Sequence, residues 1–140
     1  MSKKRKQIIN LNDAKHEAES QSSSTISIVP RNTAQEEYIT SLNNPQKRIV
    51  IATGPAGTGK THLSVLHAMH ALQCGKVDRI VITRPAVGVD GESHGFLPGT
   101  LNQKMEPWLL PIIDVFETHW SPQHVTRMIE TKIIEIAHNY

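Results

Sequence analysis

The sequence predicts an α/β fold in which a parallel sheet is flanked by helices. Residues 48–52 form an apolar run of strand length that does not alternate with polar side chains, and residues 77–83 contain a second such run centred on Ile80–Ile82. Such runs indicate strands that are covered on both faces, as in parallel sheets. Between them, large apolar residues recur at every third position from 63 to 72, which predicts a helix with one buried face. Strand, helix and strand together form a βαβ unit with a right-handed crossover.

Capping signals place the ends of two helices. Thr33 and Glu36 form a capping box, so a helix is expected to begin there and to end at Asn43–Pro45. Gly75 suits the left-handed residue that ends the helix of the βαβ unit.

The C-terminal half is expected to contain a long loop, further helices and a third strand. Residues 84–99 are rich in glycine and proline, as in loops, and Thr100–Gln103 form a second capping box. Apolar residues from 108 to 116 supply a buried face, and Ser121 followed by proline starts the next helix. The apolar run 132–137 predicts the last strand.

Size and composition limit the chain to one small domain with an N-terminal arm. The length of 140 residues excludes repeat arrays, and the hydrophobic content of 38%, beside 20% charged residues, excludes disorder of the whole chain. The net charge of +2 is too small to identify a nucleic-acid-binding protein. No apolar run is long enough to cross a membrane, and the single Cys74 suits a reducing cytoplasm. We expect residues 1–27 to be a disordered basic and serine-rich arm, and residues 28–140 to be the domain. The basic cluster of the arm is either solvated or touches phosphates.

One motif carries most of the chemical information. Residues 54–61 match the pattern G-x-x-x-x-G-K-[ST] in full. Glycines let the backbone wrap around phosphates, Lys60 places a charge on the β- and γ-phosphates, and the Thr61 hydroxyl is placed to ligate Mg²⁺. These two are the expected catalytic residues; the alternative, a structural glycine turn, is disfavoured by the flanking strand and helix. The expected nucleotide-binding residues of this region are Gly54, Pro55, Ala56, Gly57, Thr58, Gly59, Lys60, Thr61 and His62.

Several spaced segments resemble the PhoH family of phosphate-starvation-inducible P-loop ATPases, which occur in bacteria and often in phages. The resemblance spans roughly residues 30–140, and the segments that carry it are Gly54–Thr61, Gly75–Ile80, Thr83–Val87, Gly95–Gly99 and Ile134–Ala137. It implies a RecA-like core related to superfamily 1 helicases, with ATP and Mg²⁺ as ligands and RNA or single-stranded nucleic acid as partner. For a phage-encoded member the expected location is the host cytoplasm.

The resemblance also suggests roles outside the loop. Gln35 matches the family's glutamine upstream of the phosphate loop, which by analogy reads adenine; otherwise it is a surface residue of a helix. Thr83 and Arg84 lie at the end of a parallel strand, where the corresponding helicase segment runs beside nucleic acid. Arg84 either contacts a phosphate or forms a salt bridge, and Phe96 either stacks on a base or packs under its own loop.

The remaining histidines indicate no further site. His67 and His70 are close enough on one helix to share a metal, but no cysteine or carboxylate completes the ligand set, so solvated histidines are expected. His119, His124 and His138 are scattered and receive no role.

Hydrolysis needs one more strand that ends in aspartate, and the sequence contains no apolar run of that kind. In the PhoH family this Walker B strand follows the one that residues 132–137 resemble. We therefore expect the chain to be the N-terminal portion of a PhoH-like ATPase, acting as a homo-oligomer or with a complementing C-terminal portion. The alternatives are a small nucleotide or nucleoside kinase and a fragment that binds ATP without hydrolysing it.

Overall fold

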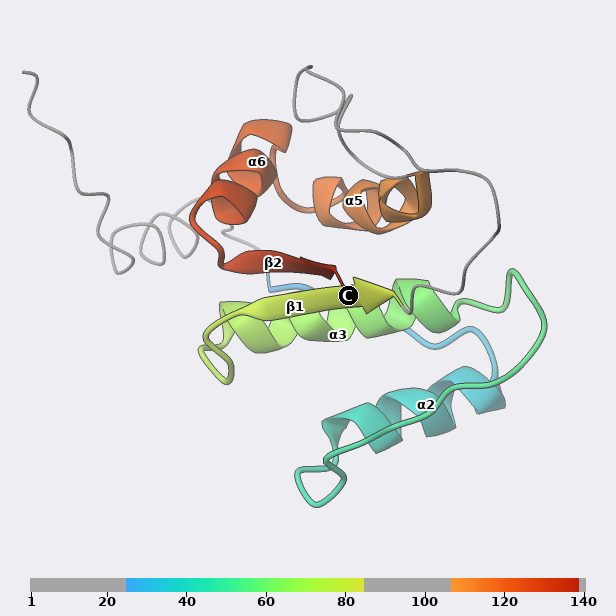
Figure 1. Cartoon of the computed structure of the whole chain (residues 1–140). Coiled ribbons are helices and arrows are strands. Elements are labelled where there is room, and N and C mark those ends of the chain that lie inside the picture. The colour runs from blue at the N-terminus through green and yellow to red at the C-terminus, as the bar shows by residue number, and fades with distance from the viewer. Residues whose placement is uncertain (1–24, 85–106, 139–140) are drawn as a thin grey trace, which may run out of the picture.

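A computed structural model describes residues 25–84 and 107–138 of the chain (Figure 1). Its elements are α2 (Thr33–Asn43), α3 (Lys60–Gln73), β1 (Ile80–Arg84), the 3₁₀ helix η1 (Pro107–Leu109), α5 (Leu110–Glu117), α6 (Pro122–Glu130) and β2 (Ile134–His138). The class is α/β, as predicted. The expected arm, the loop beyond Arg84, the capping box at 100–103 and Phe96 lie wholly or mostly outside the described residues.

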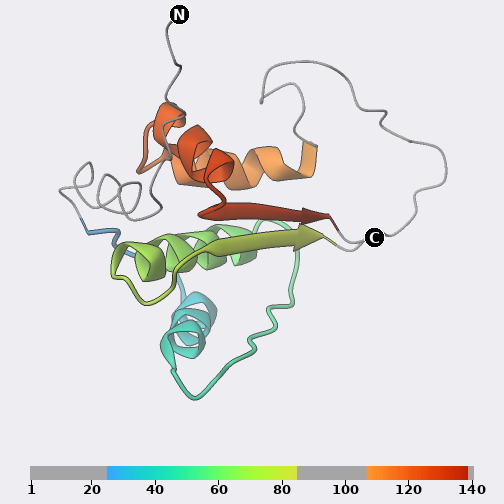
Figure 2. The same ribbon diagram turned by 60° about the vertical axis from the view of Figure 1, so that its left-hand side comes forward.

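The sheet consists of two parallel strands in the described part of the chain. Ile80 lies opposite Ile134, and Arg84 lies opposite His138. Parallel neighbours need a long crossover, and the described part of this one consists of η1, α5 and α6. Helices α3 and α5 pack directly against each other beside the strands, α6 packs on β2 and α5, and α2 packs on α3 (Figures 1 and 2).

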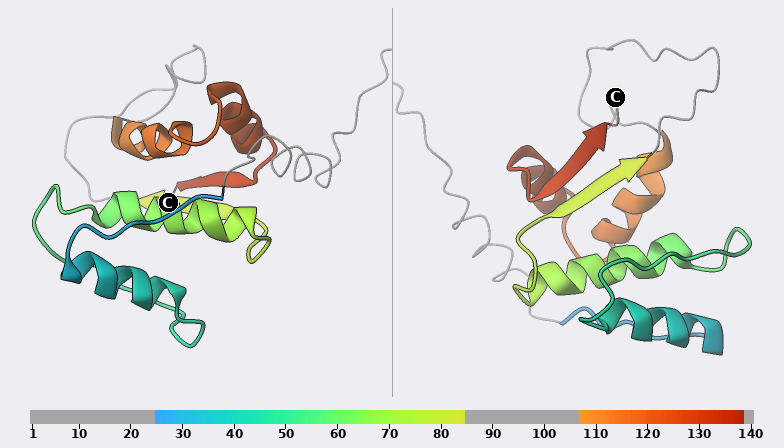
Figure 3. Two further views of the ribbon diagram at one scale, coloured as in Figure 1. Left: turned by 180° about the vertical axis from the view of Figure 1, so that it is seen from behind. Right: turned by 60° about the horizontal axis from the view of Figure 1, so that its bottom comes forward.

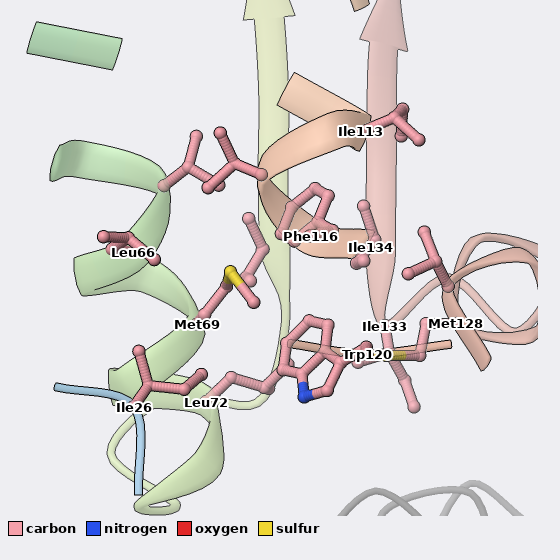
Figure 4. Close-up of a cluster of buried hydrophobic side chains, with 14 residues drawn as sticks. Ile26, Leu66, Met69, Leu72, Ile113, Phe116, Trp120, Met128, Ile133 and Ile134 are labelled. Atoms are coloured by element: carbon pink, nitrogen blue, oxygen red, sulfur yellow. The ribbon is translucent and has the colours of Figure 1, made fainter. Parts of the chain in front are cut away.

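The core lies where α3, α5, α6 and the two strands meet (Figure 4). Met69 of α3, Phe116 of α5 and Ile134 of β2 are each 0% exposed. The rings of Phe116 and Trp120 stack with centroids 5.8 Å apart. The stripe of apolar residues predicted for the helix over 63–72 is confirmed, because all four of its members are buried: Leu63, Leu66, Met69 and Leu72.

Two helices end in the same way. Gly75 has φ +69, and backbone hydrogen bonds from Gly75 N to Leu72 O and from Lys76 N to Ala71 O form a Schellman motif. The predicted role of Gly75 is thus confirmed. At the end of α6, Lys132 takes the corresponding left-handed position with φ +59.

The start of α2 differs from the prediction by one residue. The N-cap is Asn32, not Thr33, because the Asn32 side chain accepts a hydrogen bond from Gln35 N at 2.9 Å. Glu36 N donates to Asn32 O, so Thr33 already belongs to the helix. Asparagine is a stronger N-cap than threonine, and Glu36 N, the donor that a Thr33 capping box would use, bonds to Asn32 O instead. By contrast, Ser121 caps α6 as predicted.

The strand expected at 48–52 does not form, and this prediction was wrong. Ile49 and Ile51 are 81% and 82% exposed, and the segment runs beside α2, away from β1 and β2 (Figures 1 and 3). In the described residues no strand pairs with it, and an extended segment without a ladder partner is not stable in water. The βαβ unit predicted over 48–83 is therefore not formed. The strand predicted at 77–83 appears as β1, although Val81 on one of its faces is 53% exposed.

No helix in the described ranges is long and apolar enough to span a lipid bilayer.

Candidate nucleotide-binding site

The glycine loop leads directly into the first turn of α3. Gly57 and Gly59 have φ +78 and +91, backbone conformations that side chains with a Cβ rarely adopt. Gly59 is the N-cap of α3, and no side chain caps this helix end. The first N–H groups of a 14-residue helix therefore face the loop with the positive end of the helix dipole. This arrangement suits a phosphate group.

The Lys60 ammonium lies inside the loop. Its Nζ donates to Gly54 O at 2.9 Å, to Pro55 O at 2.6 Å and to Thr58 Oγ1 at 3.3 Å. An ammonium has three N–H donors, so the loop's own oxygens use all of them. The loop is thus folded around the Lys60 ammonium. Phosphate oxygens of a bound nucleotide can replace the loop oxygens as hydrogen-bond acceptors with only a small movement of the ammonium group.

Helix α2 is tied to the loop through Gln35. Its Nε2 donates to Thr58 O at 3.0 Å, and its Oε1 accepts from Arg31 N at 2.8 Å. A Cβ added at Gly59 would lie 3.0 Å from Gln35 Nε2, so the glycine permits this close approach. The Tyr38 hydroxyl donates to Lys60 O at 3.4 Å and forms a second link. Gln35 therefore holds the loop in place, a role that the sequence did not indicate.

Two cavities lie on either side of Gln35. The first, of about 530 Å³, is bounded by residues 27–31, the loop glycines, the start of α3 and His119. The second, of about 680 Å³, lies between α2 and residues 50–60 and includes Lys60. Both volumes are in the range of small-molecule sites. Of the predicted residues, Gln35 and Thr58 line both cavities, and Gly57, Gly59 and His62 line the first.

Lys60, Gly54 and Pro55 line the second cavity. Ala56 is exposed on the loop and Thr61 is exposed in the first turn of α3, and neither lines the two cavities. The role of the Thr61 hydroxyl as a Mg²⁺ ligand stays a prediction from the loop motif. In the described ranges no cluster of three histidine, cysteine or acidic side chains forms a ready metal site.

Thr83 and Arg84 are exposed at the carboxyl end of β1 and line neither cavity. The end of β1 and the start of α3 lie on the same side of the molecule (Figure 1). Ligands of open α/β sheets bind at this edge. The structure thus brings the strand end and the loop to one side without joining them in one cavity.

The histidines of α3 differ in their surroundings. Burial lowers the pKa of the His67 imidazole below its ordinary value, and the nearby charges of His70 and Lys76 lower it further. Its Nδ1 is buried without a hydrogen-bond partner in the described residues. His67 is therefore not a solvated histidine, whereas His62 is exposed and lines the first cavity.

Arg31 and His119 are among the lining residues that were not found from the sequence. Arg31 precedes α2, and His119 follows α5, yet both lie in the cavity that contains the loop glycines. Nothing in the local pattern around position 119 indicates a ligand site, because its neighbours in the cavity come from distant parts of the chain.

A glycine loop folded around a lysine at the start of a helix, beside a parallel sheet, defines a P-loop nucleoside triphosphate-binding protein. Comparison with known proteins identifies its family. The sequence profile described as "PhoH-like protein" matches residues 27–139. The chain therefore belongs to the PhoH-like family, whose members are P-loop ATPases.

Relatives in several bacteria share the matched region. The PhoH-like protein of Bacillus subtilis strain 168 is 44% identical over 111 residues, which is 79% of this chain and 34% of the relative. The PhoH-like protein of Mycobacterium tuberculosis H37Rv is 42% identical over 110 residues, 79% of this chain and 30% of the relative. Protein PhoH of Escherichia coli K12 is 43% identical over 91 residues, 65% of this chain and 25% of the relative. The chain thus spans about a third or less of the length of these relatives.

Proposed function

We propose that this chain is the ATP-binding part of a helicase-like ATPase that acts on RNA or single-stranded nucleic acid. The observation that supports this most directly is the loop of residues 54–59 folded around the Lys60 ammonium at the start of α3. In this proposal Lys60 binds the β- and γ-phosphates and Thr61 holds Mg²⁺. The location proposed is the cytoplasm, or the host cytoplasm for a phage-encoded protein, which suits the exposed free thiol of Cys74.

Gln35 has a second role in the proposal. Each end of its amide already makes one hydrogen bond within the protein. An amide has a second N–H and a second lone pair, and these are the groups with which it would read adenine. Arg84 and Thr83 are proposed to contact the nucleic-acid backbone, since both are exposed at the carboxyl end of β1.

Turnover is proposed to depend on a complementing C-terminal portion equivalent to the rest of a PhoH-like protein. The chain matches 34% or less of its relatives, and the described strands include none that ends in aspartate beside the loop. The exposed side chains of Ile49 and Ile51 offer an apolar segment that a further strand would cover. A second copy of this chain in place of that portion is the other outcome to be tested, by measuring the mass of the purified protein in solution.

Lys60→Ala tests nucleotide binding. Removing a cation that hydrogen-bonds to phosphate is expected to weaken Mg–ATP binding by at least roughly tenfold, because such bonds contribute about 1.5–3 kcal/mol. Isothermal titration calorimetry measures the change. Lys76→Ala is the matched control, since Lys76 is exposed at the far end of α3 and is expected to leave the affinity unchanged. Equal affinities of the two variants would refute the assigned site.

Hydrolysis assays separate the competing functions. The chain alone and the chain mixed with the remaining portion of a relative are each incubated with Mg–ATP, with and without single-stranded RNA. Turnover that appears only in the mixture, and rises with RNA, supports the proposal. Transfer of the phosphoryl group to a nucleoside would instead indicate a kinase, and binding without turnover in every mixture would indicate a non-hydrolysing module.

A further inference from the structure

We propose that the 530 Å³ cavity beside the loop holds the nucleoside of the bound nucleotide, and that His119 selects a purine carrying a 6-amino group. This deepens the proposed function and rests on the nucleotide binding that it assigns to the loop. The family match and the loop motif give His119 no role.

The position of the cavity suits a nucleoside. Gly57–Gly59 form one of its walls, so a ligand whose phosphates occupy the loop can extend into it. Leu63 and Leu66 of α3 add apolar surface against which a planar ring can pack. His119 borders the same space from the end of α5. In this arrangement the phosphates occupy the glycine loop and the base occupies the adjoining cavity.

A hydrogen-bond chain sets the protonation pattern of the His119 ring. The Thr118 hydroxyl donates its only hydrogen to Val115 O, at an oxygen–oxygen distance of 2.6 Å. The same hydroxyl lies 2.7 Å from His119 Nδ1, and with its hydrogen already used it can only accept there. Nδ1 therefore carries the proton in the neutral ring, and Nε2 is left as an acceptor.

An acceptor in this cavity distinguishes purines by the group at position 6. The amino group of adenine donates a hydrogen bond to Nε2, whereas the 6-oxo group of hypoxanthine or guanine is itself an acceptor and leaves Nε2 without a partner. Gln35 borders the same cavity and still offers the base both a donor and an acceptor, whereas Nε2 of His119 offers only an acceptor. We therefore assign discrimination at position 6 to His119, in addition to the adenine contact proposed for Gln35.

The test compares three ligands: ATP, inosine triphosphate, which carries a 6-oxo group, and inorganic tripolyphosphate, which has no base. We expect the wild-type chain to bind ATP about tenfold more tightly than inosine triphosphate, by titration calorimetry with Mg²⁺. His119→Ala is expected to lose most of this preference and to leave tripolyphosphate binding unchanged. His70→Ala, a histidine of α3 outside the cavity, is the matched control and keeps the preference.

Further variants separate selection from packing. His119→Gln offers an amide oxygen near the position of Nε2 and is expected to restore part of the preference. Thr118→Val removes the hydroxyl that fixes the ring and weakens the preference, whereas Thr118→Ser retains it. Nitrogen NMR of the labelled wild-type chain is expected to show His119 protonated at Nδ1 in its neutral form.

The outcomes also keep the two proposals apart. If neither ATP nor tripolyphosphate binds, the proposed function fails and this inference fails with it. If both bind with dependence on Lys60 but His119→Ala retains the preference for ATP, only the role of His119 is overturned. A neutral His119 ring protonated at Nε2 would overturn that role as well.

Discussion

At the scale of single residues, Gly59 determines how α2 and the loop fit together. Its φ of +91 lies in the left-handed region, and an added Cβ would lie 3.0 Å from the amide nitrogen of Gln35. Gly75 also has a positive φ, of +69, but an added Cβ there meets nothing within 4 Å. Both glycines thus have a left-handed backbone conformation, but only Gly59 lies so close to another side chain that an added Cβ would touch it.

Gly59→Ala is predicted to damage nucleotide binding, and Gly75→Ala only stability. Each substitution places a Cβ in the left-handed region, at a cost of about 1–2 kcal/mol in unfolding free energy. Only Gly59→Ala also displaces the Gln35 amide from Thr58, so we expect its affinity for Mg–ATP to fall at least about tenfold. Urea denaturation and titration calorimetry on both variants measure the two effects. Equal losses of affinity would show that the contact with Gln35 is irrelevant to the site.

At the scale of elements, the ends of α3 and α6 form the same Schellman motif with different residues. Ile133 N donates to Met128 O and Lys132 N to Ile129 O, the pattern that also ends α3. The left-handed position is Gly75 in one motif and Lys132 in the other. Glycine enters this conformation with less strain than lysine.

Lys132→Gly is predicted to stabilise the chain by about 0.5–1 kcal/mol, because relief of the left-handed strain exceeds the entropy that glycine gains in the unfolded state. Lys132→Ala keeps a Cβ and serves as the control, with no gain expected. Both values come from urea denaturation at equilibrium. A Lys132→Gly variant that unfolds at lower urea concentration than Lys132→Ala contradicts the prediction.

Whether an element was predicted correctly depends on how far apart in the sequence its interacting residues lie. The caps at Ser121 and Gly75 and the buried stripe of α3 were predicted correctly, since helices depend on residues three and four positions apart. The cap at Asn32 was missed because two neighbouring residues can both serve as caps. The strand at 48–52 was wrong because a strand needs a partner from elsewhere in the chain, which its own sequence does not specify.

At the scale of the whole molecule, burial separates two kinds of isoleucine that look alike in the sequence. Ile134 is 0% exposed between the strands and the helices, whereas Ile49 and Ile51 are more than four-fifths exposed (Figure 4 shows Ile134 in the core). Apolar area removed from water is the main source of stability, so these residues contribute unequally.

Ile134→Ala is predicted to reduce the unfolding free energy by about 2–5 kcal/mol, from lost burial and the cavity that remains. Ile49→Ala and Ile51→Ala are the matched controls in the chain alone, with changes within about 0.5 kcal/mol. Thermal and urea unfolding of the three variants provide the comparison. A large loss in either control would mean that residues 48–52 are packed, as the sequence had suggested.

The sequence by itself determined the glycine loop, the helix that follows it, the end of α3 at Gly75, the start of α6 at Ser121, and the family. These features depend on residues close together in the chain or on their fixed spacing. Tertiary structure alone decided that residues 48–52 pair with no strand in the described ranges, that Gln35 holds the loop through Thr58, and that His119 borders the cavity beside it. Pairing partners and cavity walls come from distant segments, and their meeting depends on how the whole core packs, which no local pattern specifies.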